Sequence, residues 1–383
     1  MELKTNVEKI SETRVKVNLE IDAKSVSKQL NLVYKDYAKK YKFPGFRPGK
    51  APRPVINNAI GKEDIYIEAT EHVLDEAYYL LIEQESLRPV GQPNFEDKEN
   101  KALIEDNKPF NVEFELEVSP VIELDSYDPI EAYLPPTDAT EDDVKQQMDM
   151  YKSIAGLKED EELADEVVKE KLSFDSIEDL KDAIKEYVKN QKEANLPRLK
   201  EDVVSLKMRE RANIEPTDEM VDFVNNVLLS DMYSNLQQAG VTLDQYLAGR
   251  GMSPDDFYAD VKKQAKDEAK TRIALDSWVK HFDLQATDAD IDAEFAKAGM
   301  QDTAMMKDLW AKTGRLWRLR EAIERTKAVE NAVESAKFTF DEERAAHQFD
   351  YLNEEEDSKD KAEEKKSDKK KSDKKEEEGK KDE

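Results

Sequence analysis

The sequence predicts an α+β N-terminal domain followed by an extended, all-α C-terminal domain. Apolar residues that alternate with polar ones, the pattern of strands, occur in the first 118 residues, whereas steps of three and four residues dominate from residue 140 onward. A chain of 383 residues is long enough for two or three domains. We therefore expect an α+β domain over 1–118, an extended linker over 119–139, a helical domain over 140–345 and a disordered charged tail over 346–383.

Six segments build the predicted N-terminal domain, and one of them is a helix whose first turn suits Pro52 and Pro54. Residues 13–21 (TRVKVNLEI) alternate apolar and polar side chains, which predicts a half-buried strand. Apolar residues at helical spacing over 23–41 and 65–84 predict two long helices. Two further strands are expected over 87–95 and over 110–118, where FNVEFELEV alternates strictly.

The segment after this domain has the composition of an extended linker. Residues 121–137 (VIELDSYDPIEAYLPPT) contain three prolines and several β-branched residues, which disfavour a helix. The last thirty residues contain no apolar side chain larger than that of Ala362. Such a segment cannot bury enough apolar surface to offset the entropy lost on ordering, so we expect it to be disordered.

Helix start signals recur from residue 140 onward. A Ser or Thr with an acceptor three residues later fits an N-cap, and five pairs have this form: Thr140/Asp143, Ser176/Asp179, Thr242/Gln245, Ser253/Asp256 and Thr287/Asp290. Helices are predicted over 143–151, 176–208, 218–239, 254–282, 288–298 and 303–336. Their apolar stripes are narrow, which favours extended antiparallel pairs of helices over a thick globule.

Composition excludes several classes of protein. A net charge of -28 disfavours a DNA-binding protein, because phosphate contacts need Lys and Arg. The chain has no cysteine for disulfides, and no apolar run approaches the length of a membrane helix. The N-terminus has no apolar stretch typical of a secretory signal. We therefore expect a cytoplasmic protein with neither a membrane nor DNA as partner.

No catalytic residue, metal site or cofactor site is predicted. The three histidines, His72, His281 and His347, lie in separate segments without the spacing of metal ligands. Glycine is scarce, and neither a phosphate-binding loop nor a dinucleotide-binding glycine pattern is present. Carboxylates are so frequent that no pair stands out as an acid–base couple.

Methionine is confined to the helical part of the chain, apart from the first residue. The other nine methionines lie at or after Met148. Flexible, polarizable thioethers on a surface can adapt to varied apolar partners, so this set favours a promiscuous binder of apolar segments. The alternative is that each methionine fills a gap in a helix core.

The stretch FPGFRPGK, residues 43–50, repeats a Pro-Gly pair on either side of Phe46 and Arg47. Pro at the second and Gly at the third position predict two successive type II turns, which would hold both side chains at a protruding tip. The surroundings are basic, with eight Lys or Arg against one acid between residues 35 and 62. This surplus favours a polyanionic, RNA-rich partner. The alternative is a plain helix connector in which Phe46 folds inward.

The continuation GFRPGKAP resembles the ribosome-docking signature of the trigger factor family. The chain fills every fixed position of that motif: Gly45, Phe46, Arg47, Gly49, Lys50 and Pro52. Residues 110–124 are similar to the family's exit from its N-terminal domain, and residues 209–228 are similar to its C-terminal arms. The resemblance extends, more loosely, over most of residues 1–345.

The resemblance implies an ATP-independent holdase chaperone that docks on the ribosome large subunit beside the exit tunnel. These six residues would contact an exit-tunnel protein and rRNA, while the helical domain holds nascent or unfolded polypeptides. It also suggests a homodimer off the ribosome. The family usually inserts an FKBP-like prolyl isomerase domain after the linker, but the helix ending near Tyr151 leaves no room for it. We therefore expect no isomerase activity and hence no enzyme. Alternatives are a ribosome-bound assembly factor that holds no clients, or a retained isomerase.

Overall fold

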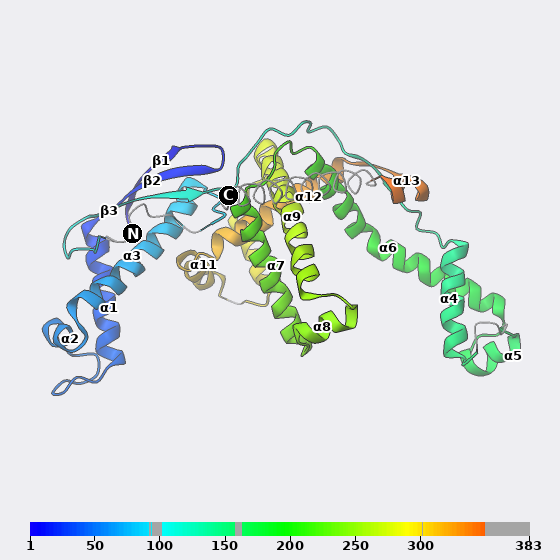
Figure 1. Ribbon diagram of the computed structural model, residues 1–383, viewed down its shortest axis with the longest axis horizontal. Helices are drawn as coiled ribbons and strands as arrows, with labels where there is room; N and C mark the ends of the chain where they lie inside the picture. The colour runs from blue at the N-terminus through cyan, green and yellow to red at the C-terminus, as the bar shows by residue number, and fades with distance from the viewer. Residues whose placement is uncertain (92, 94–101, 158–162, 301, 349–383) are drawn as a thin grey trace, which may run out of the picture. The chain divides into compact units, whose positions relative to one another are not determined.

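The computed structural model describes residues 1–91, 93, 102–157, 163–300 and 302–348 (Figure 1). Contacts divide the chain into two compact units, each built from two separated stretches. The first unit joins Met1–Tyr127 to Ser205–Glu330, and the second joins Asp128–Val204 to the stretch that begins at Asn331. Most of the predicted disordered tail, from residue 349 onward, lies outside the described residues.

A three-stranded antiparallel sheet opens the first unit. Its strands are β1 (Leu3–Lys9), β2 (Arg14–Ile21) and β3 (Phe110–Glu117), in the order β1-β2-β3. Val17 on β2 lies opposite Val7 on β1 and Phe114 on β3. Every second residue of β2 is buried, as the alternation predicted, because a strand turns successive side chains to opposite faces.

Two details of the sheet differ from the sequence prediction. Strand β1 was not predicted, because its sequence, LKTNVEK, has little apolar alternation. Its side chains are at most half-buried. The strand predicted over 87–95 is wrong for residues 87–91, where only an isolated bridge joins Pro89 to Val118. Proline has no N–H to donate to a ladder, which explains this short contact. Residues 92, 94 and 95 lie outside the described residues.

Three helices pack with the sheet around one core (Figure 1). They are α1 (Ala23–Lys40), α2 (Arg53–Ile60) and α3 (Lys62–Glu85). The Asp22 carboxylate caps α1 by accepting from the amides of Lys24 and Ser25, which satisfies N–H groups that have no partner within the helix. The core joins side chains of β2 and β3 to those of α1 and α3, so it fixes both ends of the segment between α1 and α2.

The rest of the described chain is mainly helical, as predicted. Its helices are α4 (Glu141–Ile154), α5 (Asp165–Val167), the π-helical turn η1 (Val168–Leu172), α6 (Ile177–Glu210), α7 (Asp218–Ala239), α8 (Leu243–Arg250), α9 (Pro254–Phe282), α10 (Asp288–Lys297), α11 (Thr303–Lys312), α12 (Leu316–Ser335) and α13 (Glu342–His347). All five predicted N-caps are confirmed by a hydrogen bond from the amide three residues on.

Helices α7 and α9 lie side by side in the first unit, which confirms an extended pair (Figure 1). Small side chains such as Ala265 and Ala269 of α9 face Val221 and Val224 of α7. Alanine side chains let two helix backbones approach closely and leave a narrow buried stripe. The narrow stripes read from the sequence therefore correspond to a real interface.

The helix predicted over 303–336 is wrong, because the structure breaks it into α11 and α12. Gly314 adopts a φ of 67° between them, a left-handed conformation that ends a helix and favours glycine. A Cβ atom at Gly314 would overlap the ring of Tyr79 on α3. The break therefore brings the chain close to the N-terminal helices.

The second unit contains a parallel strand pair that the sequence did not reveal. Strand β4 (Glu131–Leu134) lies within the expected linker and pairs with β5 (Lys337–Phe340). Each strand has only four residues, too few for a clear alternation pattern. A separate core in this unit gathers side chains of α4, η1 and α6 around Leu180 and Ile184.

Candidate functional site

The loop between α1 and α2 forms the two tight turns predicted from its Pro-Gly pairs. The amide of Phe46 donates to the carbonyl of Phe43 at 3.1 Å, and the amide of Lys50 donates to that of Arg47 at 2.9 Å. These are the bonds between first and fourth residues of successive β-turns. The third positions have the positive φ that a type II turn requires: Gly45 at 82° and Gly49 at 80°.

Contacts at both ends hold this loop in place. The ring of Phe43 is buried in the N-terminal core, and the amide of Gly49 donates to the carbonyl of Ala38 at 2.7 Å. Pro52 occupies the N-cap position of α2, where its carbonyl accepts from the amide of Val55 at 3.0 Å. The double turn is thus a pre-formed tip and need not be ordered when a partner binds.

The side chains at the tip face solvent. Phe46 is 41% exposed, so it does not fold inward as the connector alternative required. The side chains of Arg47 and Lys50 are exposed and make no hydrogen bond or ion pair within the described part of the chain. One aromatic ring beside two cations can bind a base or an apolar pocket together with phosphates or carboxylates.

Arg53 has a structural role that its basic character did not indicate. Its guanidinium donates to Asp106 at 2.7 Å and to Asn31 at 2.6 Å, and it lies 4.6 Å from the ring centre of Tyr34. The hydrogen bond from Arg53 holds the pKa of the Asp106 carboxyl below its usual value, against the effect of partial burial. Arg53 therefore braces the start of α2 and is less available to an external anion than Arg47.

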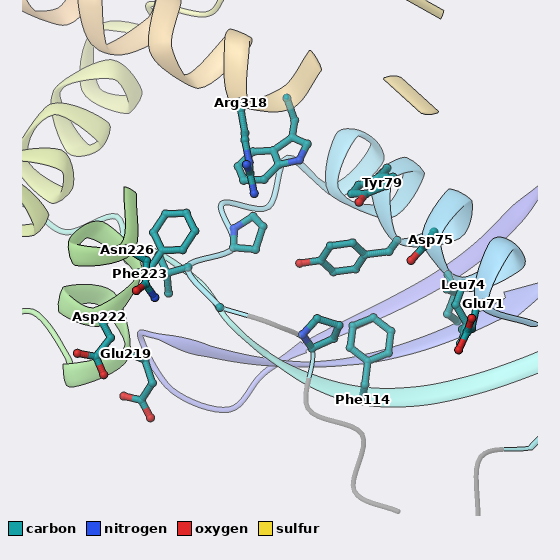
Figure 2. Close-up of a pocket in the computed structure, with 17 residues that line it drawn as sticks. Glu71, Leu74, Asp75, Tyr79, Phe114, Glu219, Asp222, Phe223, Asn226 and Arg318 are labelled. Carbon is teal, nitrogen blue, oxygen red and sulfur yellow. The ribbon is translucent and has the colours of Figure 1, made fainter. Parts of the chain in front are cut away.

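A second site is a cavity of about 550 Å³ between α3, β3, α7 and α12 (Figure 2). Its apolar wall includes Tyr78, Phe114, Phe223 and Trp317. Four carboxylates lie around it: Glu71, Asp75, Glu219 and Asp222. An aromatic cavity with an acidic edge can accept an apolar side chain next to a cationic one. Sequence reasoning missed this site because its lining comes from several segments far apart in the chain, none of which carries a local motif.

A buried ion cluster connects the N-terminal domain to the helices of the same unit. Asp276 on α9 is fully buried and accepts from Arg325 of α12 at 2.8 and 2.9 Å. Arg88, which follows α3, contacts the same carboxylate and pairs with Glu324 at 2.6 Å. Burial raises the pKa of Asp276, but the two arginines outweigh this effect and lower it overall. No local sequence pattern indicates this cluster, because its members come from α9, α12 and the segment after α3.

Few of the nine methionines are well exposed, so as a set they offer less surface contact than the sequence interpretation assumed. Met208 and Met220 are fully buried, and five others are half-buried in or near helix cores. Only Met150 and Met305, among the nine after the first residue, are exposed. Each has an exposed apolar neighbour one helical turn later, Ile154 for Met150 and Leu309 for Met305. These two pairs are the better candidates for apolar contacts with a partner.

The histidines of the chain are engaged separately. His281 stacks on the ring of Tyr127 with 3.6 Å between ring centres, and His72 lies 4.0 Å from Glu68. Within the described residues, no group of three or more His, Asp or Glu side chains is arranged to hold a metal. Over the same ranges, no helix combines the length and apolar character needed to cross a bilayer.

Comparison with known proteins covers most of the chain. Residues 3–151 match the family model described as bacterial trigger factor protein, and residues 176–334 match the model of the trigger factor C-terminus. A curated trigger factor of Pelotomaculum thermopropionicum is 22% identical, with 88% of this chain and 98% of the relative aligned. The trigger factor of Carboxydothermus hydrogenoformans is 25% identical, with 88% and 100% aligned.

One solved structure is also similar, at 15% identity and a TM-score of 0.40, covering 87% of this chain and 100% of that one. It is reported under the name "Promiscuous Substrate Recognition in Folding and Assembly Activities of the Trigger Factor Chaperone". The two family models together account for most of the chain from its sheet to α12, and the curated relatives align along nearly their whole length. The chain therefore belongs to the trigger factor family.

Proposed function

We propose that this chain is an ATP-independent holdase that docks at the exit tunnel of the ribosome large subunit through the loop between α1 and α2. Members of the trigger factor family are ribosome-associated chaperones, and this coarser role follows from membership. The docking contacts are assigned to six residues of the loop: Gly45, Phe46, Arg47, Gly49, Lys50 and Pro52. Their partners are an exit-tunnel protein and rRNA.

The observation that carries this proposal is the rigid, solvent-facing tip. Phe46 is exposed on a double turn whose ends are anchored by Phe43 and by the Gly49 amide. An exposed aromatic side chain on a pre-formed turn loses little conformational entropy when it enters a partner's pocket. The cations of Arg47 and Lys50 beside it suit rRNA phosphates or protein carboxylates.

Client binding is assigned to the helical part of the chain and to the cavity that it shares with the N-terminal domain. The exposed pairs Met150/Ile154 and Met305/Leu309 offer small apolar contacts, and the cavity beside Tyr78 and Phe223 accepts a larger side chain. Several weak, separate contacts favour fast release of a client without ATP. A homodimer off the ribosome stays a prediction from the family resemblance.

The same proposal includes the lack of a prolyl isomerase domain. Only residues 152–175 separate the matches to the two family models. The alignment with the Pelotomaculum protein has 436 positions. It includes 88% of the 383 residues of this chain, about 337 residues. About 100 positions of the relative therefore have no counterpart in this chain, a length typical of one domain.

The docking loop is tested by co-sedimentation with ribosomes. We expect Phe46→Ala with Arg47→Ala to reduce the affinity at least about tenfold, because both the ring and its neighbouring cation are lost. The control is Lys9→Ala with Ile10→Ala, an exposed cation and an exposed apolar residue on the same domain. Unchanged sedimentation of the loop variant, or equal loss in the control, contradicts the docking assignment.

Turnover of a prolyl peptide by the purified chain tests the missing domain. We expect no acceleration over the spontaneous rate. Acceleration that follows the protein concentration would show that the chain retains an isomerase site outside the domain usual in the family.

A further inference from the structure

Helix α1 carries a stripe of lysines on the side opposite its core. Lys24, Lys28, Lys35 and Lys39 follow one another at steps of four, seven and four residues. At 3.6 residues per turn these steps keep all four on one face. The buried residues of α1 define the opposite face: Val26, Leu30, Val33, Tyr34 and Ala38. We call these four lysines the lysine stripe.

The stripe is exposed, and the two carboxylates near it other than Asp36 are engaged: Asp22 caps α1, and Asp106 accepts from Ser27 and Arg53. The side chains of Lys24, Lys28 and Lys35 face solvent and make no ion pair within the described residues. Lys39 lies 3.9 Å from Asp36, at the edge of ion-pair distance, with both side chains more than two-thirds exposed. Such an exposed pair contributes little and leaves the ammonium groups available to another anion.

The charge of this region contrasts with that of the whole chain. Residues 23–62 contain ten Lys or Arg and a single acid, Asp36, whereas the chain as a whole has 60 basic and 88 acidic residues. A polyanion is thus attracted to this segment and repelled by most of the remaining surface. Three stripe lysines also line one shallow groove together with Ser27 and Asn31.

The stripe continues into the docking loop. The amide of Gly49 donates to the carbonyl of Ala38, and a Cβ atom on Gly49 would lie 3.7 Å from Cγ of Lys39. The cations of the tip, Arg47 and Lys50, therefore adjoin the last lysine of the stripe. At 1.5 Å per residue, Lys24 lies roughly 22 Å from Lys39 along the helix.

We propose that the lysine stripe binds the phosphate backbone of an rRNA helix next to the site where the loop docks. This inference rests on the proposed ribosome docking and extends its footprint along α1. A row of mobile point charges suits repeated phosphates and reads no base sequence. Asn31 lies between Lys28 and Lys35 on the same face. Its amide donates to the carbonyl of Ser27 and accepts from Arg53, which leaves one N–H to donate to a ribose 2′-hydroxyl.

The salt dependence of ribosome affinity tests the stripe. The variant Lys24→Gln, Lys28→Gln, Lys35→Gln removes three cations and leaves Lys39, which touches the loop, unchanged. Each lost phosphate contact reduces the magnitude of the negative slope of log affinity against log salt by about 0.7–0.9, so we expect the loss of three contacts to reduce it by about two to three. At low salt the affinity should fall about tenfold or more.

A charge-matched control separates this effect from net charge. Lys145→Gln, Lys169→Gln and Lys181→Gln remove three exposed lysines that also make no ion pair in the described chain. This control should keep the slope of the unmodified protein. The proposal is overturned if the stripe variant has the same slope as the control. In that case, loss of binding by the variant Phe46→Ala, Arg47→Ala still supports the docking assignment.

Crosslinking identifies the chemistry of the partner. Leu32 is 40% exposed beside the stripe, so Leu32→benzoylphenylalanine places a photoreactive group there. On ribosomes we expect an adduct that ribonuclease removes, whereas an adduct to a ribosomal protein overturns the assignment to RNA. If the unmodified chain fails to bind ribosomes, the proposed docking is wrong. The stripe is then tested by its affinity for a protein-free RNA duplex at low salt. If the variant Lys24→Gln, Lys28→Gln, Lys35→Gln binds this duplex as tightly as the unmodified chain, the proposal is overturned.

Discussion

Glu321 lies on α12 beside the buried pair of Asp276 and Arg325, with 15% of its side chain exposed. Burial raises the pKa of this carboxyl to about 7, although Arg325, 3.9 Å away, favours the charged form. In the unfolded chain the carboxyl loses its proton near pH 4.5. Between these values the folded chain binds a proton that the unfolded chain has lost, so stability falls as the pH rises from 4.5 to 7.

Glu321→Gln should remove this loss, because the amide is neutral at every pH. We expect the variant to be more stable than the unmodified chain by about 3 kcal/mol at pH 8 and nearly equal to it at pH 4.5. Urea unfolding at both pH values measures the difference. Glu330→Gln, an exposed change on the same helix, is the control. A pH-independent effect of Glu321→Gln would show that Glu321 is charged in the folded chain.

For single residues, the sequence predicted conformations and roles that depend on neighbouring residues. The conformations of Gly45 and Gly49 followed from the Pro-Gly pairs, since a turn is decided by four consecutive residues. The role of Arg53 did not follow, because its partner Asp106 lies 53 positions away. Nor could any local pattern predict that Glu321 meets Asp276.

Among the elements, the break between α11 and α12 depends on one glycine. Gly314→Ala should destabilise the first unit by about 1–2 kcal/mol for the left-handed backbone, and by more for the overlap with Tyr79. Gly240→Ala is a matched control, because Gly240 has nearly the same φ, 68°, but open space around it. Thermal unfolding of the two variants separates the overlap from the backbone strain.

A double-mutant cycle tests the contact itself. Tyr79→Ala should reduce the cost of Gly314→Ala to that of Gly240→Ala, since the ring that the new methyl group would meet is gone. Independent, additive effects of the two changes would mean that Gly314 does not face Tyr79 in solution.

The ends of helices could be read from the sequence more reliably than their interruptions. An N-cap is a contact between neighbours, and all five predicted caps have the expected hydrogen bond. Apolar periodicity, in contrast, runs through Gly314 without a visible change, because both α11 and α12 use it. Strands β4 and β5 are too short to show alternation, and each is a strand because it pairs with the other.

For the molecule as a whole, the proposed holdase role predicts suppression of aggregation without ATP. Met305→Ser with Leu309→Ser should weaken the suppression of a model client several-fold, because exposed apolar area drives such contacts. Light scattering of a denatured client measures it. Ile10→Ser with Ile67→Ser removes comparable exposed apolar side chains from the N-terminal domain and should have less effect.

Two outcomes would redirect the assignment. Equal losses in both variants would mean that general surface hydrophobicity, and not the helical part, holds the client. If the unmodified chain suppresses no aggregation but still sediments with ribosomes, a ribosome-bound assembly factor becomes the better description.

Large-scale organisation was the least accessible to sequence reasoning. Strand β4 meets β5 across 206 positions, and Met1–Tyr127 shares a compact unit with Ser205–Glu330. Periodicity, caps and turn motifs report contacts within a few residues, so they indicate what each segment forms but not which distant segment it joins. The order of domains along a sequence therefore differs from the grouping of their contacts.

The interleaving of the two units bears on how the chain is made. The sheet of β1, β2 and β3 has all its strands once residue 117 is synthesised, so the N-terminal domain can fold early. Residues 128–204 cannot complete their unit until β5 is synthesised, and the first unit cannot be completed until α12 is synthesised. Pairings this distant in sequence form late and leave apolar surface exposed meanwhile. During its own translation, this protein thus belongs to the class of unfinished chains that it is proposed to hold.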